Sequence, residues 1–417
     1  MTHKTKSIAS LSLILMLLAV PLALASSVPV AEPEDVGFSA ERLQRIHELV
    51  DRHLEAGSFA GAVTLVARHG HIAHFEAHGL MDLETRKPMA KDAIFRIMSM
   101  TKPVVGVAVL MLMEEGKVRL NDPLSRFIPE LKDLKVAVVQ GESAAGAESR
   151  FYTIPADREI TVRDLLTHTS GFVSGGTSNR EAQRASGGIR PNDTLATYLP
   201  RLAAAPLEFQ PGTRWAYSAA AGFDALARVV EVASGQTFDE FARQRLFEPL
   251  GMKDTFFYAA DPPVDRFATL YRRTESGLEK QQDPNFMNGT YLSGGGGLFS
   301  TAEDYLQFGQ MLVNGGELNG TRLLSPRTVE LMRSVYAPDS LPGRPAGEGY
   351  GLSVRVINDS IQRGTMLSDG AFGWSGAFGT HFWVDPKEKV VGIFMTQTST
   401  PAIRPDLENA VMQAIME

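Results

Sequence analysis

Two side chains capable of acyl-transfer chemistry stand three residues apart at the start of the most apolar segment of the chain. In "IFRIMSMTKPVVGVAVLMLMEEG" (94–116), Ser99 supplies a hydroxyl and Lys102 an amine, and residues 104–113 are apolar on every side. Residues three apart on a helix share a face, and Pro103 is tolerated only in the first turn of a helix. The pattern therefore predicts a buried helix that begins near Ser99 and presents both groups at its N-terminal end.

A serine in this position could act as a nucleophile. The N-terminal end of a helix has free backbone N–H groups and the positive end of the helix dipole, so the N–H of Ser99 could help to stabilise an oxyanion. Apolar surroundings remove water from Lys102, which lowers the pKa of its amine from about 10.4. Such a lysine can take a proton from the hydroxyl or stabilise a deprotonated neighbour. The spacing alone also fits a serine helix cap beside a solvated lysine.

Bulk composition limits the classes of function. The chain has 417 residues, of which 44% are hydrophobic, a formal net charge of −7 and no cysteine. A chain of this size can bury a large core, and the absence of a Lys/Arg-rich stripe argues against a nucleic-acid partner. Without cysteine, the chain has no disulfides, no thiolate nucleophile and no cysteine-ligated zinc.

The first 25 residues are typical of a secretory signal peptide. Lys4 and Lys6 precede an apolar run that ends in Ala23-Leu24-Ala25, which is the order of basic region, apolar core and small-residue cleavage site. We therefore expect an exported protein, periplasmic or secreted after cleavage near Ala25, with no membrane span in the mature chain.

The order of the predicted elements favours one sheet built from both ends of the chain. Helical spacing predicts a surface helix over 39–57, and 59–82 predicts two strands joined by a tight turn. Strand patterns return at 349–359 and 379–397, and a final helix is expected over 405–417. We expect a signal peptide over 1–25 and a single domain over 26–417, with sheet regions at about 36–98 and 345–417 and a helical lobe at about 118–340.

The predicted lobe contains helices and two excursions. Apolar periodicity predicts helices over 224–235, 237–251 and 301–316. The stretches 138–159 and 175–193 are rich in small and polar residues, and we expect them to be loops that could lie over a site.

Three further segments, taken together with Ser-x-x-Lys, resemble the serine β-lactamase and penicillin-binding-protein superfamily. They are "ITVRDLLTHTSGF" (160–172), "PGTRWAYSAAAGFDALARVVE" (211–231) and "GAFGWSGAFGTHFWVDP" (370–386). The resemblance covers about 36–415 and is strongest to the class C-like branch that includes the family VIII carboxylesterases. It implies a β-lactamase-like fold of the α/β (α+β) class, in which helices flank an antiparallel sheet and a helical lobe is inserted.

By position, the resemblance implies that Ser99 is the nucleophile that forms an acyl-enzyme. Lys102 and Tyr217 would be the proton-transfer pair, and how they divide the role of base stays open. The backbone N–H groups of Ser99 and Ala377 would form the oxyanion hole. The substrate-binding positions that the resemblance implies are Trp374, Ser375, Gly376 and Ala219.

Two of these positions depart from the usual pattern of class C β-lactamases, which have Tyr-x-Asn and Lys-Thr-Gly. Ala219 replaces the asparagine, whose amide would hold a substrate amide, and Trp374 replaces the lysine, whose charge would attract a substrate carboxylate. We therefore expect a serine carboxylesterase that acts on small, neutral, mainly short-chain esters and requires no cofactor.

Three alternatives remain open. The chain could be a class C-like β-lactamase or D,D-peptidase, an acyltransferase, or a non-catalytic penicillin-binding-like scaffold. In each catalytic case the partner is a small-molecule ester or a β-lactam-like substrate. The sequence leaves the oligomeric state open.

The histidines give only weak evidence for a metal site or for a catalytic histidine. His69, His71, His74 and His78 gather on the early hairpin, but we identify no carboxylate at ligand spacing, which favours surface or packing roles. We therefore expect no metal site. His168, in "LLTHTSG", is expected to be structural.

Two glycine-rich segments resemble other catalytic motifs only superficially. In "GWSGA" (373–377) Ala377 breaks the Gly-x-Ser-x-Gly pattern of α/β-hydrolases. The segment "SGGGGLFST" (293–301) lacks the lysine of a phosphate-binding loop. We expect it to be a close-packed turn near the catalytic cleft.

Overall fold

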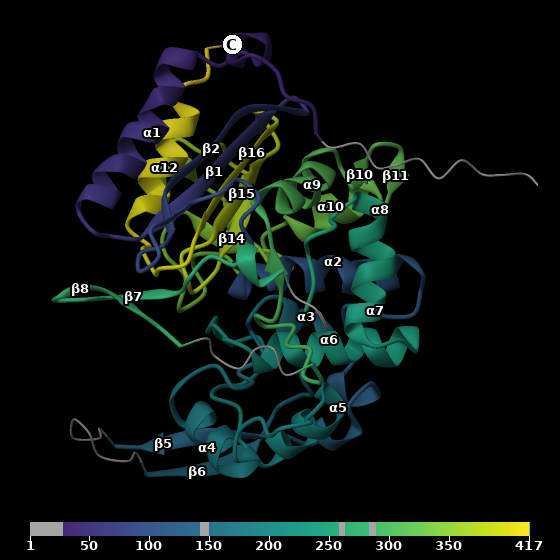
Figure 1. Ribbon diagram of the computed structural model, residues 1–417. Helices are drawn as coiled ribbons and strands as arrows, with labels where there is room; N and C mark the ends of the chain where they lie inside the picture. Colours follow the sequence, from purple (N-terminus) through teal and green to yellow (C-terminus); the bar gives the residue numbers. More distant parts are fainter. Residues whose placement is uncertain (1–27, 142–149, 258–262, 283–288, 417) are drawn as a thin grey trace, which may run out of the picture.

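An eight-stranded antiparallel sheet forms one half of the molecule (Figure 1). The computed structural model describes residues 28–141, 150–257, 263–282 and 289–416, so the expected signal peptide lies outside the described residues. The strand order is β12-β13-β14-β15-β16-β1-β2-β3. The strands are β1 (Gly61–Arg68), β2 (His71–Asp82), β3 (Lys87–Pro88), β12 (Glu348–Tyr350), β13 (Arg355–Ile357), β14 (Phe372–Ser375), β15 (His381–Asp385) and β16 (Val390–Thr396).

The two ends of the chain meet at the middle of this sheet. β1 pairs with β16 from Ala62 opposite Thr396 to Arg68 opposite Val390. The prediction of a sheet assembled from both ends is therefore confirmed. Strand pairing at such long sequence separation fixes the N-terminal helix and the C-terminal helix on the same half of the molecule.

Helices cover both faces of the sheet. α1 (Ala40–Glu55) and α12 (Ile403–Met412) lie side by side on one face, and α9 (Ala302–Val313) packs on the other. Because side chains of a strand alternate between faces, Leu65 of β1 joins the core cluster that includes α9 and α2, whereas Val66 joins the cluster under α1 and α12.

Two segments near the C-terminal end of the chain form hairpins. The predicted strand 349–359 is split into β12 and β13, because the chain turns back at Ser353, whose φ of 72° lies in the left-handed region. The segment 370–386 forms β14 and β15 around a turn at 376–380. This turn lies beside Ser99 and lines the same pocket.

The second half of the molecule is the helical lobe that the sequence predicts (Figure 1). α2 (Thr101–Glu114) lies between the sheet and the lobe and packs against α6 (Ala221–Ser234). The other α-helices of the described chain are α3 (Val162–Leu166), α4 (Gly176–Ser186), α5 (Leu195–Tyr198), α7 (Phe238–Ala242), α8 (Glu248–Leu250), α10 (Pro326–Met332) and α11 (Ser360–Arg363).

Four pairs of short strands lie outside the main sheet. They are β4 (Phe95–Arg96) with β9 (Phe299–Ser300), β5 (Lys135–Gln140) with β6 (Arg150–Pro155), β7 (Tyr271–Thr274) with β8 (Gly277–Lys280), and β10 (Glu317–Leu318) with β11 (Thr321–Arg322).

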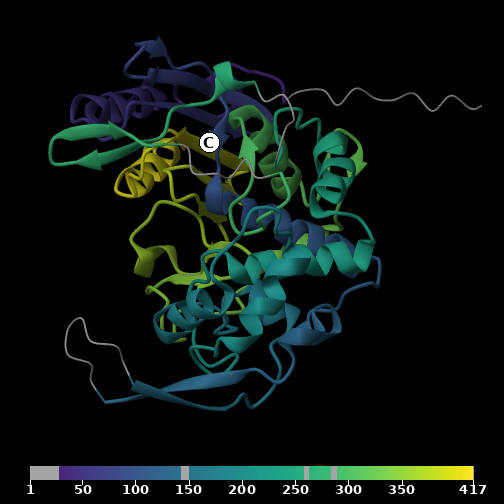
Figure 2. The same cartoon turned by 60° about the horizontal axis from the view of Figure 1, so that its bottom comes forward.

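The two expected loop excursions contain regular structure. Within 138–159, residues 138–140 belong to β5 and 150–155 to β6, and the two strands form a ribbon that projects from the lobe (Figure 2). In 175–193 the chain forms α4, whose buried residues include Ser178, Ala182 and Ser186. A helix that buries such small side chains has no apolar stripe, which explains why the sequence pattern predicts a loop there.

Candidate active site

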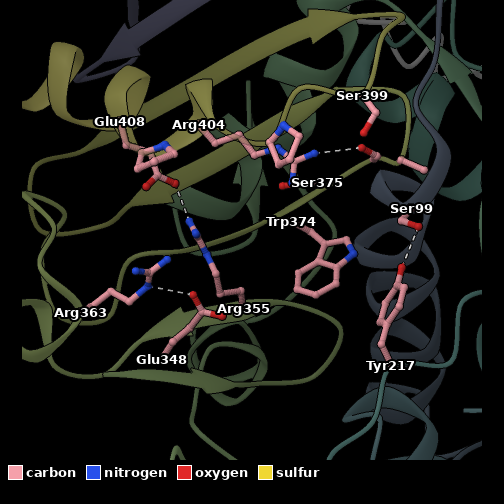
Figure 3. A pocket seen from close by; sticks show the side chains of 14 residues that line it. Ser99, Tyr217, Glu348, Arg355, Arg363, Trp374, Ser375, Ser399, Arg404 and Glu408 are labelled. Atoms are coloured by element: carbon pink, nitrogen blue, oxygen red, sulfur yellow. Dashed lines mark hydrogen bonds and ion pairs between the residues drawn. The ribbon is translucent and has the colours of Figure 1, made fainter. Parts of the chain in front are cut away.

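Ser99 lies in the 3₁₀ turn Met98–Met100, directly before the first residue of α2. The hydroxyl of Tyr217 donates a hydrogen bond of 2.7 Å to Ser99 Oγ (Figure 3). Met98 has a φ of 48°, a left-handed conformation that costs energy for a residue with a side chain and recurs at functional sites. The chain thus holds the serine on a strained turn, next to a phenol that comes from the lobe.

Lys102 is fully buried in the first turn of α2. Its Nζ lies 3.2 Å from Ser99 Oγ and donates hydrogen bonds of 2.6 and 2.7 Å to the carbonyls of Ala219 and Gly295. Desolvation lowers the pKa of the amine, and the neighbouring Tyr217 opposes this shift. Nζ therefore lies within hydrogen-bonding distance of the Ser99 hydroxyl and of both carbonyl oxygens.

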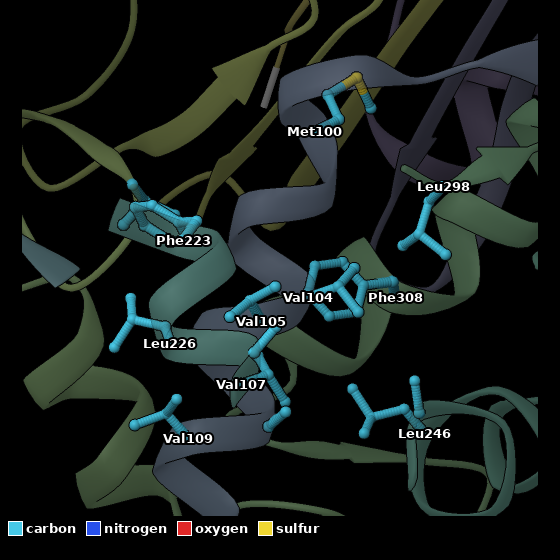
Figure 4. Close-up of a cluster of buried hydrophobic side chains, with 14 of the residues drawn as sticks. Met100, Val104, Val105, Val107, Val109, Phe223, Leu226, Leu246, Leu298 and Phe308 are labelled. Atoms are coloured by element: carbon cyan, nitrogen blue, oxygen red, sulfur yellow. The ribbon is translucent and has the colours of Figure 1, made fainter. Parts of the chain in front are cut away.

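The apolar packing of α2 maintains this desolvation. Val104 and Val105 follow directly after the first turn and are fully buried, with Phe223 of α6 and Phe308 of α9 in the same core cluster (Figure 4). Water is therefore excluded from the helix immediately behind Lys102. The apolar residues of α2 therefore contribute to the desolvation that lowers the pKa of the Lys102 amine.

One carboxylate holds the loop that supplies the Gly295 carbonyl. Asp224 of α6 is buried and accepts hydrogen bonds from the hydroxyls of Tyr291 (2.7 Å) and Ser293 (2.8 Å) and from the N–H of Gly295 (2.9 Å). No pattern in the sequence links residue 224 to 291–295, so this role of Asp224 could not be predicted from the sequence. Asp224 acts on the site through the loop, as a positioning residue.

We expect Asp224→Ala to lower kcat/KM for esters by roughly 10²-fold, because a displacement of about 1 Å in catalytic geometry has an effect of that size. Three donors, of which the Gly295 N–H is buried, would lose their acceptor, so the melting temperature should also fall. The measurement is ester kinetics on the folded fraction. Asp133→Ala, at an exposed site, is the control, and unchanged kinetics in Asp224→Ala would contradict the positioning role.

The turn after β14 brings a second backbone N–H to the site. A Cβ on Gly376 would lie 2.3 Å from the carbonyl oxygen of Ile97 and 2.2 Å from Thr380 Oγ1, so only glycine allows this turn to lie against the residues before Ser99. Ala377 follows it and lines the same pocket as Ser99. Among the described residues, none accepts a hydrogen bond from the Ala377 N–H, which leaves that donor available to a substrate.

A pocket of about 480 Å³ opens in front of Ser99 and Tyr217. Trp374, Ser375 and Gly376, which the sequence analysis placed in the substrate site, all line it (Figure 3). The side chain of Ala219 is exposed and is not part of this lining; its carbonyl contributes by binding Lys102. No described residue of 138–159 or 175–193 lines the pocket.

The far wall of the pocket is charged, which the sequence analysis did not predict. Most of these groups are paired. Arg355 donates to Glu408 at 2.6 Å, His381 lies 3.0 Å from the same carboxylate, and Arg363 donates to Glu348 at 3.2 Å. Burial alone would raise the pKa of Glu408, but Arg355 and His381 hold it at about 2.

Arg404 differs from the other cations of this wall. Its guanidinium donates to the carbonyl of Gly376 at 3.2 Å, and among the described residues its buried Nε has no hydrogen-bond partner. Burial lowers the pKa of Arg404, the charge of nearby Arg355 adds to this effect, and the Glu408 carboxylate opposes it without forming an ion pair with Arg404. Arg404 is therefore a cation of the pocket wall that no carboxylate of the described chain pairs with.

His168 lies behind the site. Its side chain is buried, its Nδ1 accepts the N–H of Ser218 at 3.2 Å, and its ring lies 4.7 Å from that of Tyr217. Burial holds the pKa of His168 well below its usual value, so the ring is neutral. It has no hydrogen bond to Ser99 among the described contacts, in agreement with the structural role that the sequence predicts.

Comparison with known proteins then decides the family. Residues 46–415 match the family model described as Beta-lactamase. The chain belongs to the Beta-lactamase family. This membership accounts for the antiparallel sheet, the inserted helical lobe and the serine at the start of the central helix, and it identifies a serine hydrolase that acts on small molecules.

Members of the Beta-lactamase family that resemble this chain include esterases. It is 32% identical over 417 residues to Esterase EstB of Burkholderia gladioli, covering 94% of this chain and 98% of that protein. It is 37% identical over 360 residues to Protein Rv1367c of Mycobacterium tuberculosis, covering 82% and 87%. The structure of EstCE1, described as a hydrolase with promiscuous acyltransferase activity, matches with a TM-score of 0.73 and 26% identity over 90% of this chain and 99% of that one.

Proposed function

We propose that this serine hydrolase is a carboxylesterase of the family VIII type, which cleaves small, mainly short-chain esters through an acyl-enzyme on Ser99. The observation that carries the proposal is the position of Ser99 Oγ, which lies 2.7 Å from the Tyr217 hydroxyl and 3.2 Å from Lys102 Nζ at the opening of a pocket. The similarity to Esterase EstB supports the same activity.

In acylation, Ser99 Oγ attacks the ester carbonyl carbon while its proton passes to the Tyr217–Lys102 pair. The two groups share the proton as a coupled system, and the two carbonyls that bind Lys102 keep the amine in place as its charge changes. The N–H groups of Ser99 and Ala377 stabilise the oxyanion of the tetrahedral intermediate. Collapse of this intermediate breaks the C–O bond, and the pair returns the proton to the departing alcohol.

In deacylation, a water molecule replaces the alcohol. The Tyr217–Lys102 pair takes a proton from the water, the hydroxide attacks the acyl carbon, and the proton returns to Ser99 Oγ as the acid leaves. An alcohol bound in place of water would receive the acyl group instead. The name of EstCE1 describes such acyl transfer in that protein, and product analysis with added methanol measures it here.

The experiment that tests the function compares initial rates on p-nitrophenyl butyrate and on a chromogenic cephalosporin. We expect ester turnover to dominate, because Trp374 occupies the position at which a lysine would attract a β-lactam carboxylate. Dominant cephalosporin turnover would contradict the esterase proposal. Absence of both activities would favour peptide substrates or the non-catalytic scaffold.

Arg404 favours a second candidate function, the hydrolysis of acyl compounds that carry a carboxylate, such as β-lactams or D,D-peptides. Its guanidinium lines the pocket without a carboxylate partner among the described residues, and an anionic substrate group would compensate its charge. A neutral ester has no anionic group that would pair with the guanidinium.

We expect Arg404→Met to lower kcat/KM about 10- to 100-fold for p-nitrophenyl hydrogen succinate, because a hydrogen bond to a charged group contributes about 1.5–3 kcal/mol. The value for p-nitrophenyl butyrate, which has the same chain length without the carboxylate, should change little. Arg363→Met is the matched control, because Glu348 already pairs with Arg363. An equal loss on both esters would rule out carboxylate recognition by Arg404.

We further propose that the enzyme is exported, periplasmic or secreted, on the basis of the signal-peptide pattern of residues 1–25. Among the described residues, no helix is both long and apolar enough to cross a membrane. Mass analysis of the N-terminus of the mature protein tests the cleavage near Ala25.

A further inference from the structure

A group of histidines and carboxylates lies where α1 meets β2, on the face of the sheet that α1 and α12 cover (Figure 1). α1 contributes two members one helical turn apart, and β2 contributes three at alternate positions, which place them on one face of the strand. The members are His47, Asp51, His74, Glu76 and His78. The sequence analysis considered His74 and His78 but had no reason to bring Asp51 and His47 of α1 to them.

One carboxylate oxygen of Glu76 lies close to nitrogen atoms of two histidines, His47 and His78. His47 Nδ1 lies 3.0 Å from Glu76 Oε2, and His78 Nε2 lies 3.6 Å from the same oxygen. Tetrahedral zinc with ligand bonds of about 2.0–2.1 Å requires its donor atoms to be roughly 3.3 Å apart. The two observed distances lie on either side of that value.

The surroundings of these residues match those of metal ligands. His47 Nε2 lies 3.0 Å from Asp51 Oδ2, and a histidine that binds a metal through one nitrogen commonly donates its other N–H to a carboxylate. On the other side, His74 Nδ1 lies 4.0 Å from Glu76 Oε1 and its Nε2 is 2.7 Å from Thr64 Oγ1. Asp51 is therefore placed to orient the ring of His47, whereas His74 lies beside Glu76 without a hydrogen bond to it.

The side chains of this group differ in their exposure to solvent, and the exposed members would allow an ion to enter. His78 is almost completely buried, with 2% of its side chain exposed, whereas His47 and Glu76 have 48% and 35% of theirs exposed. His78 is thus fixed inside the fold, while His47 and Glu76 face the side from which an ion would arrive. Thr64 Oγ1, which is 3.0 Å from His78 Nε2, would give up this contact to the ion.

We propose that His47, Glu76 and His78 bind one divalent transition-metal ion of the Zn²⁺ class, with a water molecule in the fourth position. Asp51 holds the ring of His47, and the ion joins α1 to β2. The site is separate from Ser99: β2 is four strands from β14 in the sheet order, which is roughly 19 Å at the usual spacing of strands. Its role is structural, since no pocket residue belongs to it.

The test uses untagged protein, because a polyhistidine tag would bind the same ions. The protein is treated with EDTA, dialysed and titrated with ZnCl₂ by isothermal titration calorimetry, and then with Co²⁺, whose visible absorption reports tetrahedral nitrogen and oxygen ligands. We expect one equivalent of Zn²⁺ to bind. His47→Gln should weaken binding at least about tenfold and Asp51→Asn about tenfold, the usual effect of removing a second partner of a ligand.

The matched control is the double variant His69→Gln/His71→Gln, which removes two histidines of the same hairpin that lie outside the group. It should bind Zn²⁺ as the unchanged protein does. His47 is half-exposed, so its substitution should leave the fold intact, and unchanged ester turnover verifies this. No binding of Zn²⁺, or equal affinity in His47→Gln and in the control, would overturn the proposal and leave the group as a hydrogen-bonded ion pair.

Discussion

Ester turnover by Ser99→Ala is expected to fall at least about 10⁴-fold, the scale on which loss of a nucleophile acts in serine hydrolases. Ser99 Oγ is the reacting atom in the proposed mechanism, and neither Tyr217 nor Lys102 can form the acyl intermediate in its place. The loss should be in kcat, because substrate binding depends on the pocket wall at Trp374 and Gly376, which the substitution leaves unchanged. The measurement is steady-state hydrolysis of p-nitrophenyl butyrate.

Ser399→Ala provides the matched control. Ser399 lines the same pocket, is exposed, and has no place in the mechanism, so its loss should change kcat less than about twofold. Circular dichroism would show that both variants fold. If Ser99→Ala retained ordinary activity, the assignment of the nucleophile would be wrong.

Lys102→Met should lower kcat about 10³-fold with little change in KM, because general acid–base catalysis contributes 10²–10⁴-fold. Methionine fills the space of the buried alkyl chain but provides no amine, so the carbonyls of Ala219 and Gly295 lose their donor. Tyr217→Phe, which removes only the hydroxyl bonded to Ser99, should have an effect of similar size. Steady-state kinetics on a short-chain ester measures both.

The pH dependence separates the chemical role of Lys102 from a structural one. Desolvation lowers the pKa of the amine, and a base must be unprotonated to act. Turnover should therefore rise as the pH increases through this lowered pKa and fall as the pH decreases below it, and the rise should be absent in Lys102→Met. Lys132→Met and Tyr152→Phe, at exposed positions, are the controls. An unchanged pH profile in Lys102→Met would contradict its role in proton transfer.

The local part of the site was predictable from sequence because it depends on one helix. The spacing of Ser99 and Lys102 and the position of Pro103 are properties of a helical turn, and the apolar run behind them indicates burial directly. Tyr217 and Ala377 lie far away in sequence, and only the resemblance to a family with ordered motifs could connect them to Ser99. The family and the fold class are confirmed; the roles of these residues stay predictions.

The charged wall and the histidine group could not be predicted, because each is assembled from segments without a shared pattern. Arg355 is on a three-residue strand, and Arg404 and Glu408 are on the last helix; their meeting depends on the register of β13 and the packing of α12. Likewise, His47 reaches Glu76 only through the docking of α1 on the sheet. The expectation of a pocket for neutral substrates therefore rested on Ala219 and Trp374 and overlooked Arg404.

The central claim is that Ser99 carries the acyl group, and rapid-quench mass spectrometry tests it most directly. The protein is mixed with p-nitrophenyl butyrate, quenched in acid within the first turnover, digested and analysed. The proposed mechanism predicts the added mass of one butyryl group on the peptide that contains Ser99, with none in Ser99→Ala and an undiminished amount in Ser399→Ala. Ester turnover with no adduct on that peptide, or with an adduct on another residue, would contradict it.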